Sequence, residues 1–302
     1  MKLLSRVLLI LFHHLALLQA SKAQYSLPDV PLAFSTMTVE PHVFHLKRNH
    51  INIPSGGHLQ GIQALTDSTF IISGSSSSCS YYLTTDLHKI LSLHNISDSP
   101  YRHAGGCQLI DGQLIVGVED NEKKDRSIIY SIRFDDRNNQ FSKALIIKRE
   151  GFYKRSTAGA SGFVKLSDGR YIIAIADWDS RNIDFYCGVS FSPLLRDSVI
   201  TYHAPDQGHW CSYQSINLLT DTAGKVYLIG FALDGAINKA DLFELTIADG
   251  KADLRLVSTR NFRCKGTGFR YAAGIDMSKD GKLAIYSCSR RASPDVVVNV
   301  FR

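Results

Sequence analysis

Gly61-Ile62-Gln63-Ala64-Leu65 and the segment after it, Phe70-Ile71-Ile72-Ser73-Gly74, form the first of five similar pairs along the chain. In each pair a small residue opens a short apolar segment, which runs into a turn and then into a strongly β-forming segment. The other openings are Gly106-Cys107-Gln108-Leu109-Ile110, Gly162-Phe163-Val164-Lys165-Leu166, Ser215-Ile216-Asn217-Leu218-Leu219 and Gly274-Ile275-Asp276-Met277. They recur at roughly 45 to 60 residues, near the repeat length of propeller blades. This spacing predicts radial repetition of one four-stranded unit.

Two more strands complete most of the predicted units. These strands are short runs rich in Ile, Val, Tyr and Phe, and Asp-Gly or related turns bound them. The fifth unit stops at its third strand, residues 295–301, whereas residues 37–53 precede the first opening and contain Val43-Phe44-His45-Leu46. We therefore predict an all-β, five-bladed β-propeller over residues 37–302. An N-terminal strand should complete the last blade and cover its edge.

The amino terminus has the pattern of a secretory signal. Lys2 and Arg6 precede an apolar stretch, residues 7–18, that is too short to span a bilayer comfortably, and small residues follow at Ser21-Lys22-Ala23. We expect residues 1–23 to be a removable signal and residues 24–36 to be a linker, with an uncleaved anchor as the alternative. The protein should then be secreted or periplasmic, with no stable membrane span.

Charge excludes one class of partner. Removing the signal lowers the formal net charge from +6 to +3, because Lys2, Arg6 and Lys22 are lost. The remaining Lys and Arg residues are scattered rather than gathered in a stripe, which is not the pattern of a nucleic-acid-binding surface. We expect a glycan or an extracytoplasmic protein as partner, and no nucleic acid.

The six cysteines suggest a set of disulfide bonds, because exported proteins usually oxidise an even number of them. Consecutive pairing gives similar separations of 28, 24 and 24 residues. We therefore predict bonds 79–107, 187–211 and 264–288. The alternative is six free thiols, because Cys107 and Cys187 lie in or beside apolar strands where a small apolar residue would serve.

The whole pattern, from about residue 37 to the end, resembles the β-propeller superfamily. Among five-bladed members it is similar to tachylectin-type lectins and to the furanosidases that cleave arabinan or fructan. The furanosidase pattern needs an Asp in the first inner strand, another Asp later and a Glu further on. The corresponding inner positions here are Gln63, Gln108, Val164, Asn217 and Asp276. The carboxylate pair that glycoside hydrolysis requires is therefore absent from the expected blades.

Amides and histidines converge where the first strands begin. His58-Leu59-Gln60-Gly61 and His103-Ala104-Gly105-Gly106 are close copies, and a glutamine, Gln63 or Gln108, follows each at the same offset. One interpretation is a polar pocket for a sugar. The other is that these groups bond one another or the backbone across a narrow channel. The candidate ligand-binding residues are His58, Gln63, Arg102, His103, Gln108, Trp178, Trp210, Asn217, Arg270 and Asp276.

Aromatic and charged residues of the predicted rim complete that set. Trp178 and Trp210 fall in rim loops, where they could stack on a sugar ring or pack between blades. Arg102 and Arg270 precede openings and could bind an anion or pair with nearby acids.

Carboxylates follow the second strands at Glu119, Asp177 and Asp234, so they should share one rim. Such a group could hold calcium, with Asn217 and Asp276 completing the shell. The alternative is solvated acids in exposed turns, because the spacing matches no compact calcium loop.

Two functions of different class follow. The main prediction is a recognition module whose rim and channel mouth bind a glycan or a partner protein. The alternative is a calcium-assisted hydrolase of esters, phosphoesters or glycosides.

Overall fold

The computed structural model describes residues 26–135, 140–190, 196–206, 208, 210–278, 281–292 and 294–302. The expected signal, residues 1–23, lies outside the described residues. In the described part the chain is built almost entirely of β-strands, labelled β1 to β20, with one short helix, α2 (Val30–Thr36). Within that part, no helix combines the length and the apolar character needed to cross a membrane.

The strands form groups of four antiparallel neighbours in chain order. The first group is β2 (Leu59–Thr66), β3 (Thr69–Ser75), β4 (Cys79–Asp86) and β5 (Ile90–Asp98), and the second is β6 (His103–Ile110), β7 (Gln113–Glu119), β8 (Arg126–Asp135) and β9 (Gln140–Glu150). The third is β10 (Ala160–Lys165), β11 (Tyr171–Ala176), β12 (Asn182–Gly188) and β13 (Arg196–His203), and the fourth is β14 (Ser215–Thr220), β15 (Val226–Asp234), β16 (Ile237–Ala248) and β17 (Lys251–Phe262). The last is β18 (Ala272–Met277), β19 (Leu283–Cys288) and β20 (Asp295–Phe301), with β1 (His42–Lys47) beside β20.

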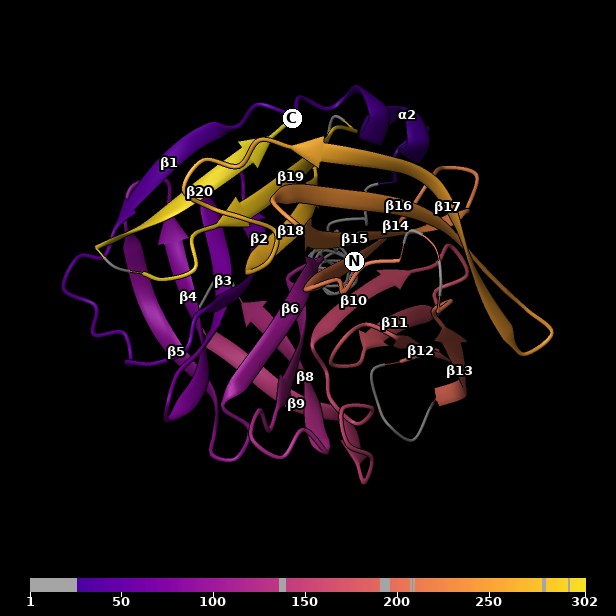
Figure 1. Ribbon diagram of the computed structural model, residues 1–302, viewed down its shortest axis with the longest axis horizontal. Helices are drawn as coiled ribbons and strands as arrows, with labels where there is room; N and C mark the ends of the chain where they lie inside the picture. Colours follow the sequence, from indigo (N-terminus) through magenta and orange to yellow (C-terminus); the bar gives the residue numbers. More distant parts are fainter. Residues whose placement is uncertain are drawn as a thin grey trace, which may run out of the picture.

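The groups follow one another around a common centre, as a β-propeller arranges them (Figure 1). The first strand of each group contacts the first strand of the next, from β2 through β6, β10 and β14 to β18, and β18 contacts β2. Two of these contacts are short parallel pairings, at Ala273 with Gly61 and at Ala160 with Gly106. They join the groups into sheets of eight, eight and four strands.

Glycines on the first strands permit this close approach. A Cβ built on Gly274 would lie 1.8 Å from the Ile62 carbonyl oxygen and 2.3 Å from Gln63 Nε2. A Cβ on Gly106 would lie 2.7 Å from Ser215 Oγ. Real Cβ atoms do not come this near to other atoms, so a small residue at each opening is a packing requirement.

Apolar side chains fill the space between successive groups. The five clusters of buried apolar residues each draw on two neighbouring groups, including one between the last group and the first. In that cluster Phe70 of β3 packs edge-on against Tyr286 of β19, with ring centroids 5.4 Å apart. Burial of both faces explains why second strands such as β11, Tyr-Ile-Ile-Ala-Ile-Ala, are continuously apolar rather than alternating.

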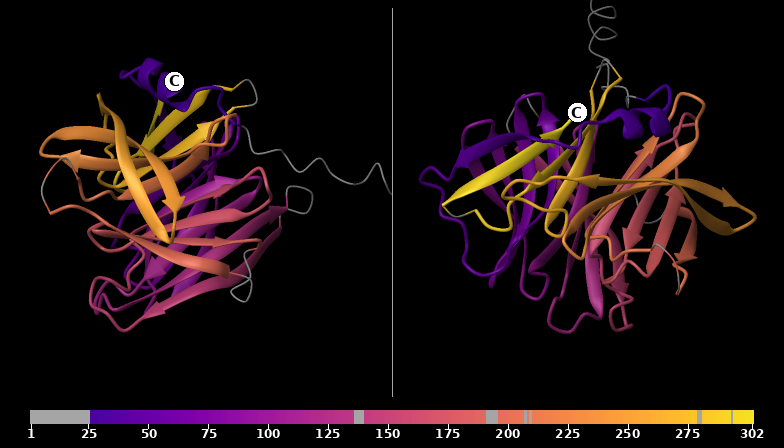
Figure 2. Two further views of the ribbon diagram at one scale, coloured as in Figure 1. Left: turned by 90° about the vertical axis from the view of Figure 1, so that its right-hand side faces the viewer. Right: turned by 45° about the horizontal axis from the view of Figure 1, so that its top comes forward.

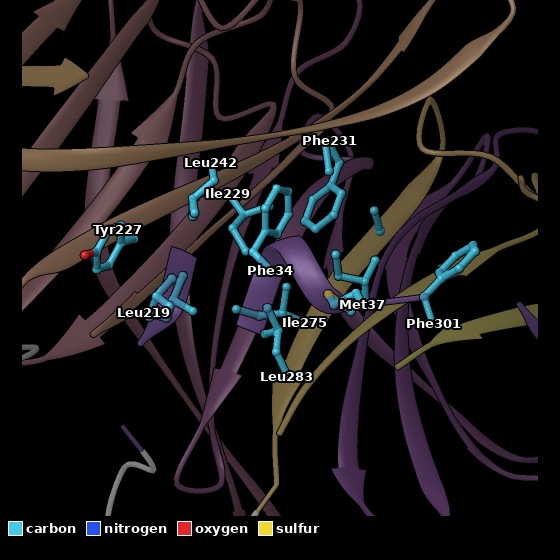
Figure 3. Packing of buried hydrophobic residues seen from close by; sticks show 14 of the residues in the cluster. Phe34, Met37, Leu219, Tyr227, Ile229, Phe231, Leu242, Ile275, Leu283 and Phe301 are labelled. Carbon is cyan, nitrogen blue, oxygen red and sulfur yellow. The ribbon is translucent and has the colours of Figure 1, made fainter. Parts of the chain in front are cut away.

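The segment before β1, which the sequence led us to expect as a linker over residues 24–36, is packed against the sheets in its described part. Asp29 caps α2 by accepting a hydrogen bond from Leu32 N at 2.8 Å, and Phe34 is fully buried. Figure 3 shows Phe34 and Met37 among side chains of the fourth and last groups. Arg260 donates to the carbonyl oxygens of Phe34 and Met37 at 3.0 and 2.6 Å, which satisfies the end of the helix.

The N-terminal strand lies beside the C-terminal one. β1 pairs with β20 in antiparallel register, from His42 opposite Val300 to Lys47 opposite Asp295. Thr38 N also donates to the Arg302 carbonyl oxygen at 2.8 Å. Figure 2 shows α2 close to the carboxyl end of the chain in both views. The residues that precede β2 are therefore held by the end of the chain.

The predicted disulfides 79–107, 187–211 and 264–288 are not found: no disulfide joins any of the six cysteines in the structure. Cys264 Sγ lies 3.7 Å from Ser287 Oγ, and neighbouring side chains on a strand point to opposite faces. Cys288 therefore points away from Cys264. Cys79 and Cys107 likewise pack in different clusters. Similar spacing along the chain placed these residues in similar blade regions but not with their sulfur atoms facing each other.

Candidate active site at the mouth of the first strands

A cleft of about 580 Å³ opens where the first strands begin. Its walls come from residues at or just before the starts of these strands and from the turns after β7, β11 and β19. It is lined by His58, Gln60, His103, Glu119, Asn121, Lys124, Gly159, Trp178, Asp179, Tyr213, Gln214, Arg270, Tyr271 and Arg290. We call it the mouth cleft. It gathers five of the predicted site residues, namely His58, His103, Glu119, Trp178 and Arg270.

The innermost polar pair of the mouth cleft is His103 with Glu119. His103 begins β6 and lies opposite Glu119, which ends β7, so the antiparallel register places their side chains together. Nδ1 of His103 is 3.0 Å from Oε1 of Glu119, an ion-pair distance, and neither atom meets hydrogen-bond geometry with any partner in the described part of the chain. The other carboxylate oxygen accepts from Ala158 N at 2.7 Å. The Glu119 side chain is 0 % exposed, so its carboxylate fixes the imidazole without reaching solvent.

Gln60 connects this pair to the second histidine. Its Nε2 lies 2.8 Å from Nε2 of His103 and also contacts Nε2 of His58. The amide nitrogen of Gln60 can only donate, so Nε2 of each imidazole is the acceptor in these contacts. The result is a chain of four side chains, Glu119–His103–Gln60–His58, along one wall of the cleft.

Sequence reasoning missed Gln60 as a site residue, although it lies within the first His-x-x-Gly copy. The pairing of β2 with β3 shifts register between Leu59 and Gly61, which leaves Gln60 as the extra residue of a bulge. A bulge re-aims a side chain, and here it places the amide between the two imidazoles. The second copy has Gly105 at the matching position. The difference between the copies was the signal that could have found Gln60.

Burial keeps His58 neutral. Desolvation lowers the pKa of His58 to about 4, and electrostatic interactions with His103 and with the guanidinium groups of Arg290 and Arg270 act in the same direction. Its imidazole is therefore uncharged at neutral pH and can accept the proton of the Gln60 amide. The pKa shift also shows that both arginines act electrostatically on this wall of the cleft.

The other walls combine aromatic rings with cations. Lys124 Nζ lies 4.1 Å from the centroid of the Trp178 ring, and the Arg290 guanidinium lies 5.3 Å from that of Tyr271. These are cation–π distances. One face of Trp178 therefore carries an ammonium group, where the sequence suggested a bare platform for a sugar. Lys124 and Arg290 were not predicted, because loop residues carry no periodic signal.

Gln108, predicted as a ligand-binding residue, is instead bonded to the backbone of two other groups. Its amide oxygen accepts from Phe163 N at 2.9 Å and from Leu218 N at 2.8 Å. Its Nε2 donates to the Leu218 carbonyl oxygen at 2.6 Å. The side chain is 1 % exposed and ties β6 to β10 and β14.

Gln63 and Asn217 have the same role. Gln63 Nε2 donates to the Cys107 carbonyl oxygen at 2.9 Å, and its oxygen accepts from Leu109 N at 3.3 Å. Asn217 Nδ2 donates to the same Cys107 oxygen at 3.2 Å. We call Gln63, Gln108 and Asn217 the inner amides. All three are buried, and none lines the mouth cleft. The inner amides therefore follow the second interpretation drawn from the sequence, in which such groups bond to backbone across the channel.

Asp276 lies at the opposite ends of the first strands. It lines a cavity of about 120 Å³ together with Gln108 and residues near the carboxyl ends of β2, β6 and β18. The mouth cleft and this cavity have no lining residue in common. Asp276 therefore does not share a site with His58 and His103.

Two predicted rim residues lie outside the mouth cleft. Trp210 donates from Nε1 to the Ser180 carbonyl oxygen at 2.9 Å and packs against Tyr213 and Phe243, with ring centroids 5.0 and 5.2 Å apart. It fills the space between the third and fourth groups. Arg102 pairs with Glu122 and donates to a backbone carbonyl oxygen.

The three predicted metal ligands are not brought together. Glu119 is committed to His103 and Ala158, whereas Asp177 accepts from the backbone of Arg181 and Asn182 in the turn after β11. Asp234 lies at the end of β15, near Lys239 Nζ at 3.4 Å. In the described ranges no group of three or more His, Cys, Asp or Glu residues is placed to hold a metal ion. A shared rim therefore did not make these three carboxylates converge.

Comparison with known proteins supports the fold. No family model matches the chain. A curated relative, the tRNA (guanine-N(7)-)-methyltransferase non-catalytic subunit of Kluyveromyces lactis, is 28% identical over 122 residues, which cover 39% of this chain and 24% of that protein. The chain thus spans about a quarter of the length of this relative. The relative is itself a β-propeller, which agrees with the resemblance stated from the sequence.

Solved structures with a similar fold include glycan-cleaving enzymes. A bifunctional GH43-CE protein of Bacteroides eggerthii has a TM-score of 0.50 at 10% identity, over 87% of this chain and 34% of that one. An exo-β-1,3-galactanase of Phanerochaete chrysosporium has a TM-score of 0.49 at 9% identity, over 87% of this chain and 64% of that one. An α-L-arabinanase of Penicillium chrysogenum has a TM-score of 0.46 at 10% identity, over 88% of this chain and 98% of that one. The first of these similarities agrees with a β-propeller fold.

The same comparison corrects one sequence-based interpretation. The main prediction was a recognition module, whereas the solved structures described above are named as glycan-cleaving enzymes, so that prediction is not supported.

Proposed function

We propose that the described groups are five blades of one ring, closed where β1 pairs with β20. The contacts among first strands run from β2 to β18 and return to β2, which supports a closed arrangement. An apolar cluster between the last group and the first supports the same closure. We expect the amides of His42–Lys47 that face β20 to exchange hydrogen as slowly as those of β20. Fast exchange of β1 beside a protected β20 would contradict closure by this strand.

We further propose that the protein hydrolyses glycosidic bonds in the mouth cleft, so that its partner is a glycan. The observation that carries this proposal is the chain Glu119–His103–Gln60–His58 at the wall of an open cleft. A histidine held by a buried carboxylate is a common arrangement for general acid–base catalysis. Gln63 and Gln108 of the inner amides have no comparable capacity, because their polar atoms are bonded to backbone.

Hydrolysis of a glycoside needs one group to give a proton to the leaving oxygen and another to activate water or attack the sugar. His103 is the candidate catalytic residue, because it lines the cleft and its Nε2 contacts only a neutral amide, that of Gln60. Glu119 is a positioning residue, because its side chain is fully buried. Asp179 also lines the cleft, and its carboxylate, 45 % exposed and held by Lys154 at 3.0 Å, is the candidate second carboxylate.

Calcium is not part of this proposal. Glu119, Asp177 and Asp234 have separate protein partners and do not converge on one point of the cleft. We also propose that the protein acts outside the cytoplasm, where polymeric glycans are accessible. The apolar stretch at residues 7–18 supports this location from sequence.

His103→Gln and Glu119→Gln test the hydrolase proposal on a panel of neutral and acidic oligosaccharides. His103→Gln should lower kcat roughly 10²- to 10⁴-fold, because it removes the proton-transfer group. Glu119→Gln keeps an oxygen for Ala158 N but removes the negative charge beside Nδ1. It should therefore change the pH dependence of kcat as well as its size, which a loss of packing alone would not do.

The matched control is Glu122→Gln, which removes an exposed carboxylate of the same rim. It should leave kcat and its pH dependence unchanged. Full activity of His103→Gln, or no hydrolysis of any oligosaccharide by the unmodified protein, would overturn the proposal.

A further inference from the structure

We infer that the sugar unit bound in the mouth cleft is anionic and carries a carboxylate or a sulfate group. This inference rests on the proposed function and names its substrate class. Three permanent cations line the cleft, Lys124, Arg270 and Arg290, against two carboxylates, Glu119 and Asp179. Counted by residues, the cleft has an excess of only one positive charge. The excess is larger once the interaction partners of the two carboxylates are considered.

Neither carboxylate of the cleft neutralises these cations. Glu119 is 0 % exposed and faces His103, and Asp179 pairs with Lys154. In the described part of the chain, Lys124, Arg270 and Arg290 form no ion pair with a carboxylate, whereas Arg102, Arg126 and most other rim cations do. The positive charge of the cleft therefore lacks an internal counter-charge.

Aromatic rings hold two of the cations in place. Lys124 lies over Trp178 and Arg290 over Tyr271, at 4.1 and 5.3 Å from the ring centroids. A cation–π contact fixes a charged group at a site without neutralising its charge. The lowered pKa of His58, to which Arg290 and Arg270 contribute, shows that the field of these guanidinium groups extends to the proposed catalytic wall.

The chemistry of these donors selects the ligand. A guanidinium group binds a carboxylate or a sulfate through two parallel hydrogen bonds, and such charge-assisted bonds are about twice as strong as neutral ones. A neutral sugar would leave the positive charges without partners. A uronate carboxylate and a sulfate ester both satisfy them, so the two sources share one recognition chemistry.

Equilibrium binding to His103→Gln, which the proposed mechanism disables, separates recognition from turnover. The probes are an oligogalacturonide, a sulfated galactan oligosaccharide and a neutral galactan oligosaccharide, measured by calorimetry at low and at high salt. At about 20 mM salt we expect at least one acidic probe to bind roughly tenfold tighter than the neutral one, with the advantage largely lost near 0.5 M salt. Binding of one acidic probe and not the other identifies carboxylate or sulfate as the group recognised.

Adding Arg270→Gln or Arg290→Gln should weaken binding of the preferred acidic probe on the order of tenfold each. Arg133→Gln is the matched control. It removes an exposed arginine from β8, where Arg133 pairs with Gln113 at the opposite end of the second group, and should not change binding.

Equal binding of the neutral and acidic probes would overturn the inference, as would unchanged binding in both arginine variants. Hydrolysis by the unmodified protein is measured on the same three probes. Selective acidic binding without hydrolysis would overturn the proposed hydrolase and leave the ligand class intact. Hydrolysis of the neutral probe without a preference for the acidic probes would overturn the inferred ligand class and leave the proposed hydrolase intact.

Discussion

The inner amides and the mouth cleft use the same kinds of side chain on the same first strands, but they bind different partners. Gln108, inside, makes three hydrogen bonds, all to the backbone of other strands. Gln60, at the mouth, contacts two imidazoles that line a cleft. An amide bonded to backbone stabilises the assembly of strands. An amide bonded to imidazoles orders groups that remain able to exchange protons.

The difference arises from position along the strand. In the middle of the first strands, neighbouring backbones approach closely because glycines such as Gly274 and Gly106 remove the side chain that would separate them. A polar side chain there meets backbone on every side. At the strand starts the chains diverge into loops, so polar side chains meet one another and the cleft. The same residue type therefore contributes to stability in the middle of the first strands and to a candidate active site at their starts.

The largest effect we expect comes from Gln108→Ala. This change leaves Phe163 N, Leu218 N and the Leu218 carbonyl oxygen without their partner in a buried region. Each unsatisfied group costs about 1–3 kcal/mol, so we expect a loss of roughly 3–5 kcal/mol in the free energy of unfolding. Urea titration measures it. Gln214→Ala, a partly exposed amide of the cleft, is the control and should change stability by less than about 0.5 kcal/mol.

Gln60→Ala makes the same change at the mouth and should have a smaller effect on stability. It removes contacts to two side chains, His58 and His103, and leaves no backbone group unpaired by its loss. We expect about 1 kcal/mol or less in the free energy of unfolding. We also expect a change in the pH dependence of kcat, because the hydrogen bond to Nε2 of His103 is lost. A loss of stability equal to that of Gln108→Ala would contradict the distinction between the inner amides and the amide of the mouth cleft.

The effect that is smallest at neutral pH concerns His58, because its contribution to stability changes only as the pH falls. Burial lowers the pKa of His58 from 6.5 to about 4, so between these values the unfolded chain binds a proton that the folded chain does not. The stability contributed by the neutral imidazole is therefore present above pH 6.5 and is lost as pH falls towards 4. His58→Gln should flatten this part of the curve of urea midpoint against pH. His42→Gln, an exposed histidine of β1, should leave it unchanged.

Much of the fold could be predicted from sequence, because it depends on a local signal repeated along the chain. Each opening with a small residue marks a first strand, and each following apolar segment marks a second strand buried on both faces. The short helix over Val30–Thr36 was missed because seven residues give little periodic signal. Its capping residue, Asp29, and the proline after it were the available evidence.

The disulfide prediction failed for a different reason. Cys264 and Cys288 are as far apart along the chain as Cys187 and Cys211, but separation does not specify the direction of a side chain. The alternation of faces along β19 points Cys288 away from Cys264. One residue of register would have reversed that outcome, and register depends on contacts between strands that lie far apart in the chain.

The candidate site was predictable in its residue types and its end of the molecule. Repetition of His-x-x-Gly placed His58 and His103 together, and the end of β7 placed Glu119 on the same rim. The partners were not predictable. Lys124, Arg290 and Gln60 enter the cleft through turns and a bulge, which have no period to follow.

Short-range sequence patterns and long-range contacts between strands thus determine different features of the protein. Strand content, the length of the repeated unit and the end that gathers polar side chains follow from short-range patterns, because each depends on residues close together in the chain. Which carboxylate holds which imidazole, which amides bond to backbone and which cations keep an uncompensated charge depend on contacts between strands up to about 110 residues apart. Those contacts exist because packing the four-stranded groups around one centre brings distant backbones within hydrogen-bonding distance.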